Sequence, residues 1–222
     1  MSHFCVYVFS NEDGRSVEDI LAPFDENITF PPYVKLTKQQ AIEKVRKEID
    51  DYRYHGCYAK YIKDPDAYRE EHKDRKDHLN YVEKEFPQRF FWTDEQCYEE
   101  EAKWYDKEMI DKNGNLLSTY NPNAKWDWWS EGGRWSKMLI TKTGEHVDTA
   151  YANEIDWEKT GHPFAFVTPD VNQKDAWHER GEMGWWAIVT DEKEEDVWKK
   201  EFFDYVKDLP DDMVVTLIDC HI

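Results

Sequence analysis

Hydrophobic and polar residues alternate along the first ten positions of the chain, MSHFCVYVFS. Phe4, Val6 and Val8 fall on one side of an extended backbone, and the residues between them fall on the other. Successive side chains of a strand point to opposite faces, so this alternation predicts a first strand at residues 3–10.

Apolar residues recur at helical spacing in three later segments. In the first, Thr37 is placed to cap a helix that continues to about Tyr54. The sequence TDEQ, which begins at Thr93, has the capping-box pattern and predicts a second helix as far as Ile110. The third segment, 191–209, carries an apolar face and is stopped by a proline.

Residues 66–85 contain seven acidic and five basic side chains and few apolar ones. Oppositely charged side chains one turn apart stabilise an exposed helix. We expect one solvated helix here, with His72 and His78 on different faces as surface residues rather than ligands.

Strand-like runs follow in the second half of the chain, at 134–141, 164–168, 184–190 and 213–221, and 145–149 is expected to return as a hairpin partner of the first of these. The order of elements predicts an α+β fold with a mainly antiparallel sheet of ferredoxin-like, split βαβ type and helices on one face. We interpret residues 1–222 as a single domain with a helical insertion at about 38–110.

Composition narrows the classes of function. The chain has 29 basic and 48 acidic residues, a formal charge of −19, which repels a phosphate backbone and attracts a basic protein surface. We therefore expect no direct contact with nucleic acid. There is no run of eighteen apolar residues and no secretory signal pattern, so we expect a cytoplasmic protein without a membrane segment. Four cysteines without a CxxC pair predict reduced thiols.

The stretch KWDWWSEGGRW at 125–135 concentrates tryptophan beside two adjacent glycines. One interpretation is a binding pocket in which Trp128 forms a wall and the amides of Gly132 and Gly133 face an anion beside Arg134. The alternative is that the indoles cover one end of a sheet and that Arg134 stacks on them or pairs with a nearby carboxylate. We expect four tryptophans to be mostly buried, namely Trp126, Trp128, Trp135 and Trp185.

A second dense stretch, WHERGEMGWW at 177–186, supplies acidic, basic and anion-binding groups. It is interpreted either as part of an active site or as a hairpin whose charged residues are merely exposed. If the protein is an enzyme, the candidate catalytic residues are Arg134, His178, Glu182 and His221.

The two ends of the chain predict a third site. If the first and last strands are antiparallel neighbours, His3 meets His221, and Asp219 lies on the same face as His221. These three residues are the candidate ligands of a metal ion, zinc most readily. The alternative is an ordinary pair of strand-end histidines or a hydrogen-bonded Asp–His pair. The common nucleotide, protease, hydrolase and calcium signatures are missing from the sequence, so an enzyme here is an unusual one.

Five blocks of the sequence resemble a family of small proteins of phages and prophages: MSHFCVYVFS, LAPFDENI, YNPNAKWDWWSEGGRW, WHERGEMGWWAIV and LPDDMVVTLIDCHI. The resemblance spans most of the chain except residues 53–115. The resemblance does not identify catalytic residues in this sequence. It implies a phage accessory protein, and such proteins, when small and acidic, resemble inhibitors of host defence, including anti-CRISPR proteins.

The leading hypothesis is therefore an acidic inhibitor that acts as a monomer in the cytoplasm of the host bacterium. It is expected to bind a type II CRISPR effector nuclease at a basic surface and to block DNA loading, with the acidic segment 191–212 as the candidate contact. One alternative is an enzyme or binding protein for a nucleotide-like small molecule, which uses the Trp/Gly/Arg pocket. Another is a structural or assembly component of a phage.

Overall fold

The chain divides into two compact units. Unit 1 comprises Met1–Thr29 and Tyr120–Ile222, and unit 2 comprises the intervening segment Phe30–Thr119. The helical insertion expected at about 38–110 lies inside unit 2, whereas the sequence favoured one domain over the whole chain. The computed structural model describes residues 2–11, 14–169, 176–184 and 188–222.

Unit 1 is built around a mixed, mainly antiparallel sheet with the strand order β4-β12-β1-β8-β9, and β7 pairs with β12 beyond this path. Two short hairpins, β5–β6 and β10–β11, lie outside it. The strands are β1 (His3–Asn11), β4 (Trp128–Glu131), β5 (Leu139–Ile140), β6 (His146–Val147), β7 (Thr149–Tyr151), β8 (Ala165–Val167), β9 (Trp177–Glu179), β10 (Glu182–Met183), β11 (Val189–Thr190) and β12 (Met213–His221). The helices are α1 (Val17–Leu21), α7 (Trp157–Thr160) and α8 (Glu195–Lys207).

The predicted α+β class is confirmed, and the first and last strands are antiparallel neighbours, with His3 opposite His221. The ferredoxin-like topology is not confirmed. In a split βαβ unit a third strand separates the two parallel strands. Here β1 and β8 are parallel and directly paired, with Val6 opposite Ala165.

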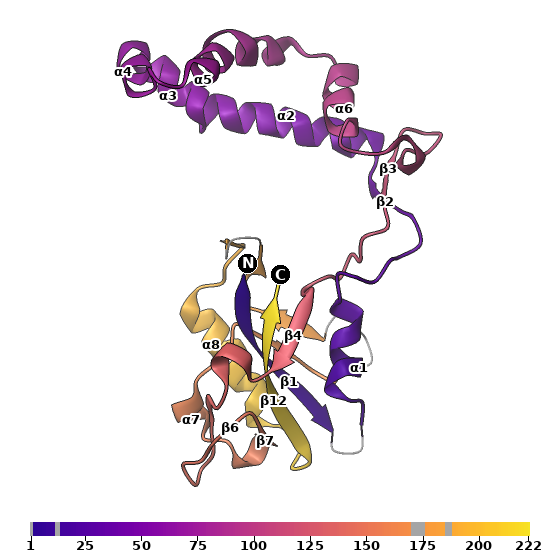
Figure 1. The fold of residues 1–222 in the computed structure, drawn as a ribbon, viewed down its shortest axis with the longest axis vertical. Coiled ribbons are helices and arrows are strands. Elements are labelled where there is room, and N and C mark those ends of the chain that lie inside the picture. Colours follow the sequence, from indigo (N-terminus) through magenta and orange to yellow (C-terminus); the bar gives the residue numbers. More distant parts are fainter. Residues whose placement is uncertain (1, 12–13, 170–175, 185–187) are drawn as a thin grey trace. The chain divides into compact units, whose positions relative to one another are not determined.

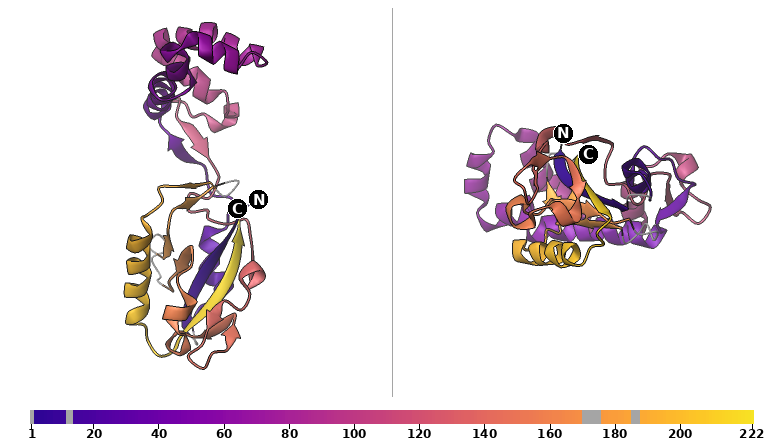
Figure 2. Two further views of the ribbon diagram at one scale, coloured as in Figure 1. Left: turned by 90° about the vertical axis from the view of Figure 1, so that its left-hand side faces the viewer. Right: turned by 90° about the horizontal axis from the view of Figure 1, so that it is seen from below.

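Helices cover both faces of the sheet, not one face as predicted (Figure 1). On one face Tyr7, Phe9 and Leu217 pack against Trp198 and Phe202 of α8. This helix runs along one side of the sheet in the left panel of Figure 2. The opposite face packs against α1 and Trp126. The alternation of β1 therefore divides its apolar residues between two cores.

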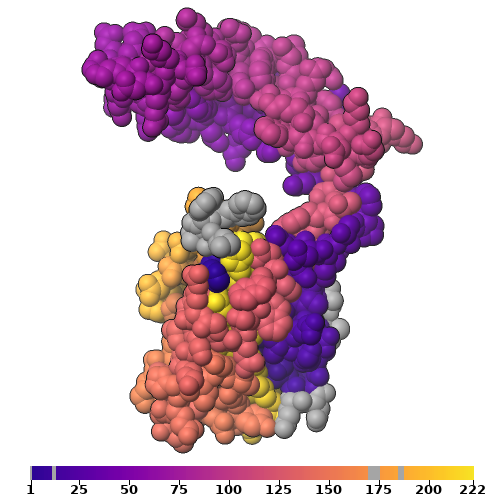
Figure 3. All heavy atoms as spheres, in the orientation of Figure 1, coloured from indigo at the N-terminus to yellow at the C-terminus, as the bar shows by residue number. Residues whose placement is uncertain are grey.

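The central strand β12 is almost entirely buried, and little of its yellow C-terminal segment reaches the surface seen in Figure 3. Both chain ends lie at the same end of the sheet (Figure 1). There Ser2 donates its amide to the Ile222 carbonyl at 3.2 Å, and the Ile222 amide donates to the Ser2 carbonyl at 3.1 Å. Side chains next to the two termini are therefore held against each other.

Unit 2 is a helical unit closed by a small two-stranded antiparallel sheet, whose strands precede and follow the helices in the sequence. Its strands are β2 (Tyr33–Leu36) and β3 (Leu116–Ser118), and its helices are α2 (Lys38–Tyr54), α3 (Cys57–Lys63), α4 (Pro65–Glu71), α5 (Lys76–Asn80) and α6 (Asp94–Ala102). The buried positions of α2 pack on Phe86 and Cys97. The predicted cap at Thr37 and the predicted capping box at Thr93 are present, with Thr37 accepting from the amide of Gln40 and Thr93 from that of Gln96.

The single solvated helix predicted at 66–85 is wrong, because the chain there forms α4, α5 and a π-helical turn. His72 and His78 are not independent surface residues either. The Tyr68 hydroxyl lies 2.7 Å from Nε2 of His78, and its ring stacks on His72 with centroids 4.1 Å apart. Tyr68 is buried, so its contacts bend the segment around itself.

Candidate functional site

His3 and His221 lie side by side at the end of the sheet where the two chain termini meet. The antiparallel register of β1 and β12 makes them direct partners, and their ring centroids are 4.9 Å apart in an edge-to-face arrangement. The side chains are 13% and 14% exposed. The predicted meeting of these two imidazoles is therefore confirmed.

Each of the two histidines has its own carboxylate. Nδ1 of His3 lies 2.9 Å from Oδ1 of Asp219, and Nδ1 of His221 lies 2.5 Å from Oδ1 of Asp127. A carboxylate only accepts hydrogen bonds, so the proton of each pair is on Nδ1 and Nε2 is left for another partner. Nε2 of His221 is buried and makes no hydrogen bond to any described residue.

Asp127 is the residue of this site that the sequence did not assign to it. Its amide donates to the carbonyl of His221 at 2.9 Å, at the start of β4, which pairs antiparallel with β12. The available signal was the position of Asp127 between two tryptophans at a strand entrance. The signal could not be used without knowing that β4 is the neighbour of β12.

The tandem glycines pack around carboxylates of the protein itself. Gly132 and Gly133 have φ of 66° and 53°, which favours glycine. A Cβ on Gly133 would lie 2.4 Å from that of Asp219, and one on Gly132 would lie 2.9 Å from the carboxylate carbon of Asp148. Oδ2 of Asp219 accepts the Arg134 amide at 3.0 Å. Close approach to these two side chains explains why both positions are glycine.

Two backbone amides at the predicted anion pocket already have partners within the protein. The Arg134 amide binds Asp219, and the amide of Gly132 donates to the Leu217 carbonyl, while the Arg134 side chain is exposed. The negative group expected beside these glycines is the protein's own carboxylate, so the local backbone serves folding.

The tryptophans of this stretch differ from one another in their exposure to solvent. Trp126 is buried and donates its indole N–H to the Leu21 carbonyl at 3.1 Å, as predicted. Trp135 is partly buried. Trp128 is 53% exposed and meets His3 edge to face at 6.4 Å, so its predicted burial is wrong. Trp185 lies outside the described residues.

Two of the four residues proposed for catalysis, His178 and His221, have separate partners. His178 stacks on Phe166 and lies 3.3 Å from Glu201, which also binds Lys193. His221 is paired with Asp127, and Glu182 lies in the β10–β11 hairpin. These contacts do not assemble the four as one catalytic group. The two strands of the WHERGE stretch do not form a hairpin with each other either, because β9 pairs with β8 and β10 pairs with β11.

Metal ligation by three protein groups is not found in the part of the chain that the structure describes, where no cluster of three or more histidine, cysteine or acidic side chains has suitable geometry. Asp219 instead orients His3 and the Arg134 amide. Burial, followed by the charge of Asp219, raises the pKa of the Cys5 thiol to about 12. Burial also raises the pKa of Cys220. Both thiols are therefore protonated at neutral pH in the folded chain.

The acidic excess is concentrated in unit 1. Unit 1 has 28 acidic and 12 basic residues, a net charge of −16, whereas unit 2 has 20 acidic and 17 basic residues, a net charge of −3. Residues 191–212 alone contain ten acids and four lysines. Three of these lysines form ion pairs within the segment: Lys193–Glu201, Lys199–Glu195 and Lys200–Asp204.

The acids that follow α8 are not neutralised in this way. Asp208, Asp211 and Asp212 are exposed, and none forms an ion pair with a basic side chain among residues that the structure describes. Oδ1 of Asp211 accepts a hydrogen bond from the side-chain amide of Asn153 at 3.4 Å. This end of the helix therefore presents uncompensated negative charge.

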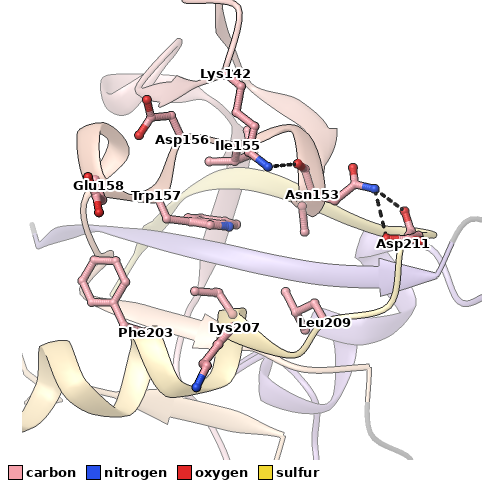
Figure 4. Close-up of a pocket in the computed structure, with 12 residues that line it drawn as sticks. Lys142, Asn153, Ile155, Asp156, Trp157, Glu158, Phe203, Lys207, Leu209 and Asp211 are labelled. Carbon is pink, nitrogen blue, oxygen red and sulfur yellow. Dashed lines mark hydrogen bonds between the residues drawn. The ribbon is translucent and has the colours of Figure 1, made fainter.

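A pocket of about 670 Å³ lies beside the same end of α8. Figure 4 shows the indole of Trp157 lying across it, between Phe203 and Leu209 on one side and Asn153 on the other. Its charged lining residues are Lys142, Asp156, Glu158, Lys207 and Asp211. Asp156 is held by Lys159 at 2.6 Å, and Lys142 donates to the Asn153 carbonyl at 2.7 Å. The pocket combines an aromatic wall with three carboxylates and two lysines.

Comparison with protein-family models, curated proteins and solved structures gives no match. Within the described residues, the helices lack either the length or the apolar character needed to cross a membrane. All five sequence blocks quoted for the phage-protein resemblance fall within the bounds of unit 1, and the unmatched stretch 53–115 falls within unit 2.

Proposed function

We propose that this chain is a phage-encoded inhibitor of a bacterial defence complex and that it covers a basic protein surface with the acidic surface of unit 1. The target class is a type II CRISPR effector nuclease, which holds its guide and target in a positively charged channel. Occupation of that channel blocks DNA loading without a catalytic step. The protein acts as a monomer in the host cytoplasm.

The uneven distribution of charge is the observation that carries this function. A net charge of −16 within unit 1 accelerates association with a basic surface and selects against acidic partners. Charge needed only for solubility has no reason to leave unit 2 almost neutral.

The acids at the end of α8 are the proposed centre of contact. Asp208 is the C-cap of this helix, and Asp211 and Asp212 follow it. A carboxylate at a helix C-terminus meets the negative end of the helix dipole and costs roughly 0.3–1 kcal/mol. A role in binding accounts for acids at a position where they do not stabilise the helix.

The pocket beside these acids suits a lysine or arginine side chain of the partner. A cation that enters it meets the ring of Trp157 and the carboxylates of Glu158 and Asp211. Cations over a tryptophan face gain about 0.5–1 kcal/mol when exposed and about 2 kcal/mol when desolvated. Such a contact adds geometric specificity to the general attraction between the surfaces.

Binding to a purified type II effector and its guide, measured at rising salt, tests this function. We expect association at low salt that weakens steeply as salt increases, together with loss of DNA binding by the effector. The variant Asp208→Lys/Asp211→Lys/Asp212→Lys is expected to bind at least tenfold more weakly than the wild type.

The matched control changes the same amount of charge in unit 2, as Asp66→Lys/Glu70→Lys/Asp74→Lys, and is expected to bind like the wild type. No association at low salt rejects this target. Equal weakening by both triple variants rejects the specific role of α8 and leaves only a general charge effect.

A further inference from the structure

The two histidines at the sheet end are arranged as metal-binding histidines are. A histidine that binds a metal through Nε2 usually donates its Nδ1 proton to a carboxylate, which fixes the tautomer and the ring. His3 and His221 both have this partner, Asp219 for the first and Asp127 for the second. The occurrence of the arrangement twice, on adjacent imidazoles, distinguishes this site from a single hydrogen-bonded Asp–His pair.

The spacing of the two rings fits one shared ion. Zinc–nitrogen bonds are about 2.0–2.1 Å, so two imidazoles on one tetrahedral ion have ring centres roughly 5 Å apart. The centroids of His3 and His221 are separated by 4.9 Å. Their position on directly paired residues of β1 and β12 holds that separation in place.

One nitrogen of the pair needs a partner. Nε2 of His221 is buried and makes no hydrogen bond within the described part of the chain. Buried polar atoms in proteins are nearly always bonded, and an unpaired one calls for a bound water, ion or ligand. The buried Asp219 and the partly buried Asp127 place negative charge behind both rings, which favours a cation over a neutral partner.

We propose that His3 and His221 bind one divalent transition-metal ion, zinc by preference, through their Nε2 atoms. Asp219 and Asp127 do not coordinate the ion but orient its ligands. Imidazole suits zinc and its first-row neighbours, whereas calcium and magnesium prefer oxygen. This inference goes beyond the proposed inhibitor function and does not depend on it.

Two protein ligands leave the remaining positions of a tetrahedral ion open. A closed structural zinc site uses four protein ligands. The described residues offer no third ligand of suitable geometry. The ion would therefore carry water, or a nitrogen or oxygen donor from a small molecule or protein partner, beside the exposed ring of Trp128.

Titration of metal-free, untagged protein with zinc and with cobalt tests the site. We expect one ion per chain, a cobalt absorption spectrum typical of nitrogen and oxygen ligands, and a melting temperature that rises with zinc and falls with a chelator. His3→Ala and His221→Ala are each expected to abolish stoichiometric binding. Asp127→Asn should retain the fold and weaken zinc binding by about 10–100-fold.

The matched control is His178→Ala, because His178 also has a carboxylate on Nδ1 but stacks on Phe166. This variant should bind zinc like the wild type. Absence of stoichiometric binding by the wild-type protein overturns the assignment. Zinc binding that is unchanged both in Asp127→Asn and in one of the two histidine variants also overturns it. Circular dichroism of every variant shows whether a loss of zinc binding reflects unfolding instead.

Discussion

The two units use their acidic side chains in different ways. In unit 2 acids are paired with bases on neighbouring helices, as in Lys44–Glu101 at 2.7 Å, Arg69–Glu83 at 2.7 Å and Arg89–Glu100 at 3.2 Å. In unit 1 acids outnumber bases by more than two to one, and several carboxylates bind the backbone or a histidine instead. Asp148, for example, accepts from the Lys137 amide and the Ser136 hydroxyl.

A high content of acidic residues can therefore affect stability in two different ways. A near-balanced set of charges, as in unit 2, can stabilise a helical surface by local pairs, each of small effect. An unbalanced set, as in unit 1, repels itself and lowers stability, so its presence calls for another role of the acids. In unit 1 some acids shape the GGRW turn and orient the histidines, and the rest remain as a charged surface.

The largest loss of stability is expected when the indole of Trp198 is removed from the core of unit 1. Its indole is fully buried and donates to the Pro163 carbonyl at 2.8 Å. Trp198→Ala should lower the free energy of unfolding of unit 1 by about 4 kcal/mol, whereas Val197→Ala, on the exposed side of α8, should change it by less than about 0.5 kcal/mol. Hydrogen exchange should then show lost protection in β1 and β12 with α2 unchanged. Equal loss in α2 would show that the units unfold together.

The second largest loss of stability is expected in the GGRW turn, where Gly133 packs against Asp219. Gly133→Ala places a Cβ 2.4 Å from that of Asp219 and puts alanine at φ 53°. Backbone strain of about 1–3 kcal/mol and displacement of a charge-assisted hydrogen bond should together cost about 3 kcal/mol. Gly144→Ala is the control, because Gly144 has φ 89° with nothing within 4 Å, so only strain of about 1–2 kcal/mol applies. Similar melting temperatures for the two variants would contradict the packing explanation.

Alkaline pH should weaken unit 1 through its buried thiols. The pKa of Cys5 is raised by burial from 9.0 to about 12, and that of Cys220 is also raised. A raised pKa leaves stability intact below pH 9, and stability falls above it because the thiols ionise only in the unfolded chain. The loss between pH 8 and pH 10 should be about 1.4 kcal/mol per thiol. Denaturant unfolding of Cys5→Ala/Cys220→Ala should show a correspondingly smaller loss, and an unchanged pH dependence would exclude the thiols as its cause.

Local signals in the sequence were enough to predict several elements. The strand at 213–221 was predicted with its observed bounds, because its apolar run is long and ends with the chain. The cap at Thr37 and the capping box at Thr93 depend on residues close together in the sequence, so they predicted the starts of α2 and α6. The meeting of His3 and His221 followed from one correct assumption about strand pairing.

Features that depend on distant contacts could not be predicted. The pairing of Asp127 with His221 joins residues 94 positions apart and requires β4 to be the neighbour of β12. The glycine pair was interpreted as a ligand site because the sequence does not reveal that Asp219 fills the space beside Gly133. Direct pairing of β1 with β8, which differs from the predicted split topology, likewise depends on contacts across more than 150 residues.

The smallest predicted effect is the change in stability with salt, which should have opposite signs in the two units. Screening weakens the repulsion among the acids of unit 1 and also weakens the exposed ion pairs of unit 2, such as Lys38–Glu95 and Arg46–Asp94. Raising sodium chloride from about 20 to 500 mM should therefore stabilise unit 1 and slightly destabilise unit 2, each by under about 1 kcal/mol. Hydrogen exchange of β12 and α2 in the same sample measures both changes at once. Destabilisation of β12 by salt would mean that the excess charge of unit 1 does not oppose its folding, and that the contrast between the units is one of composition only.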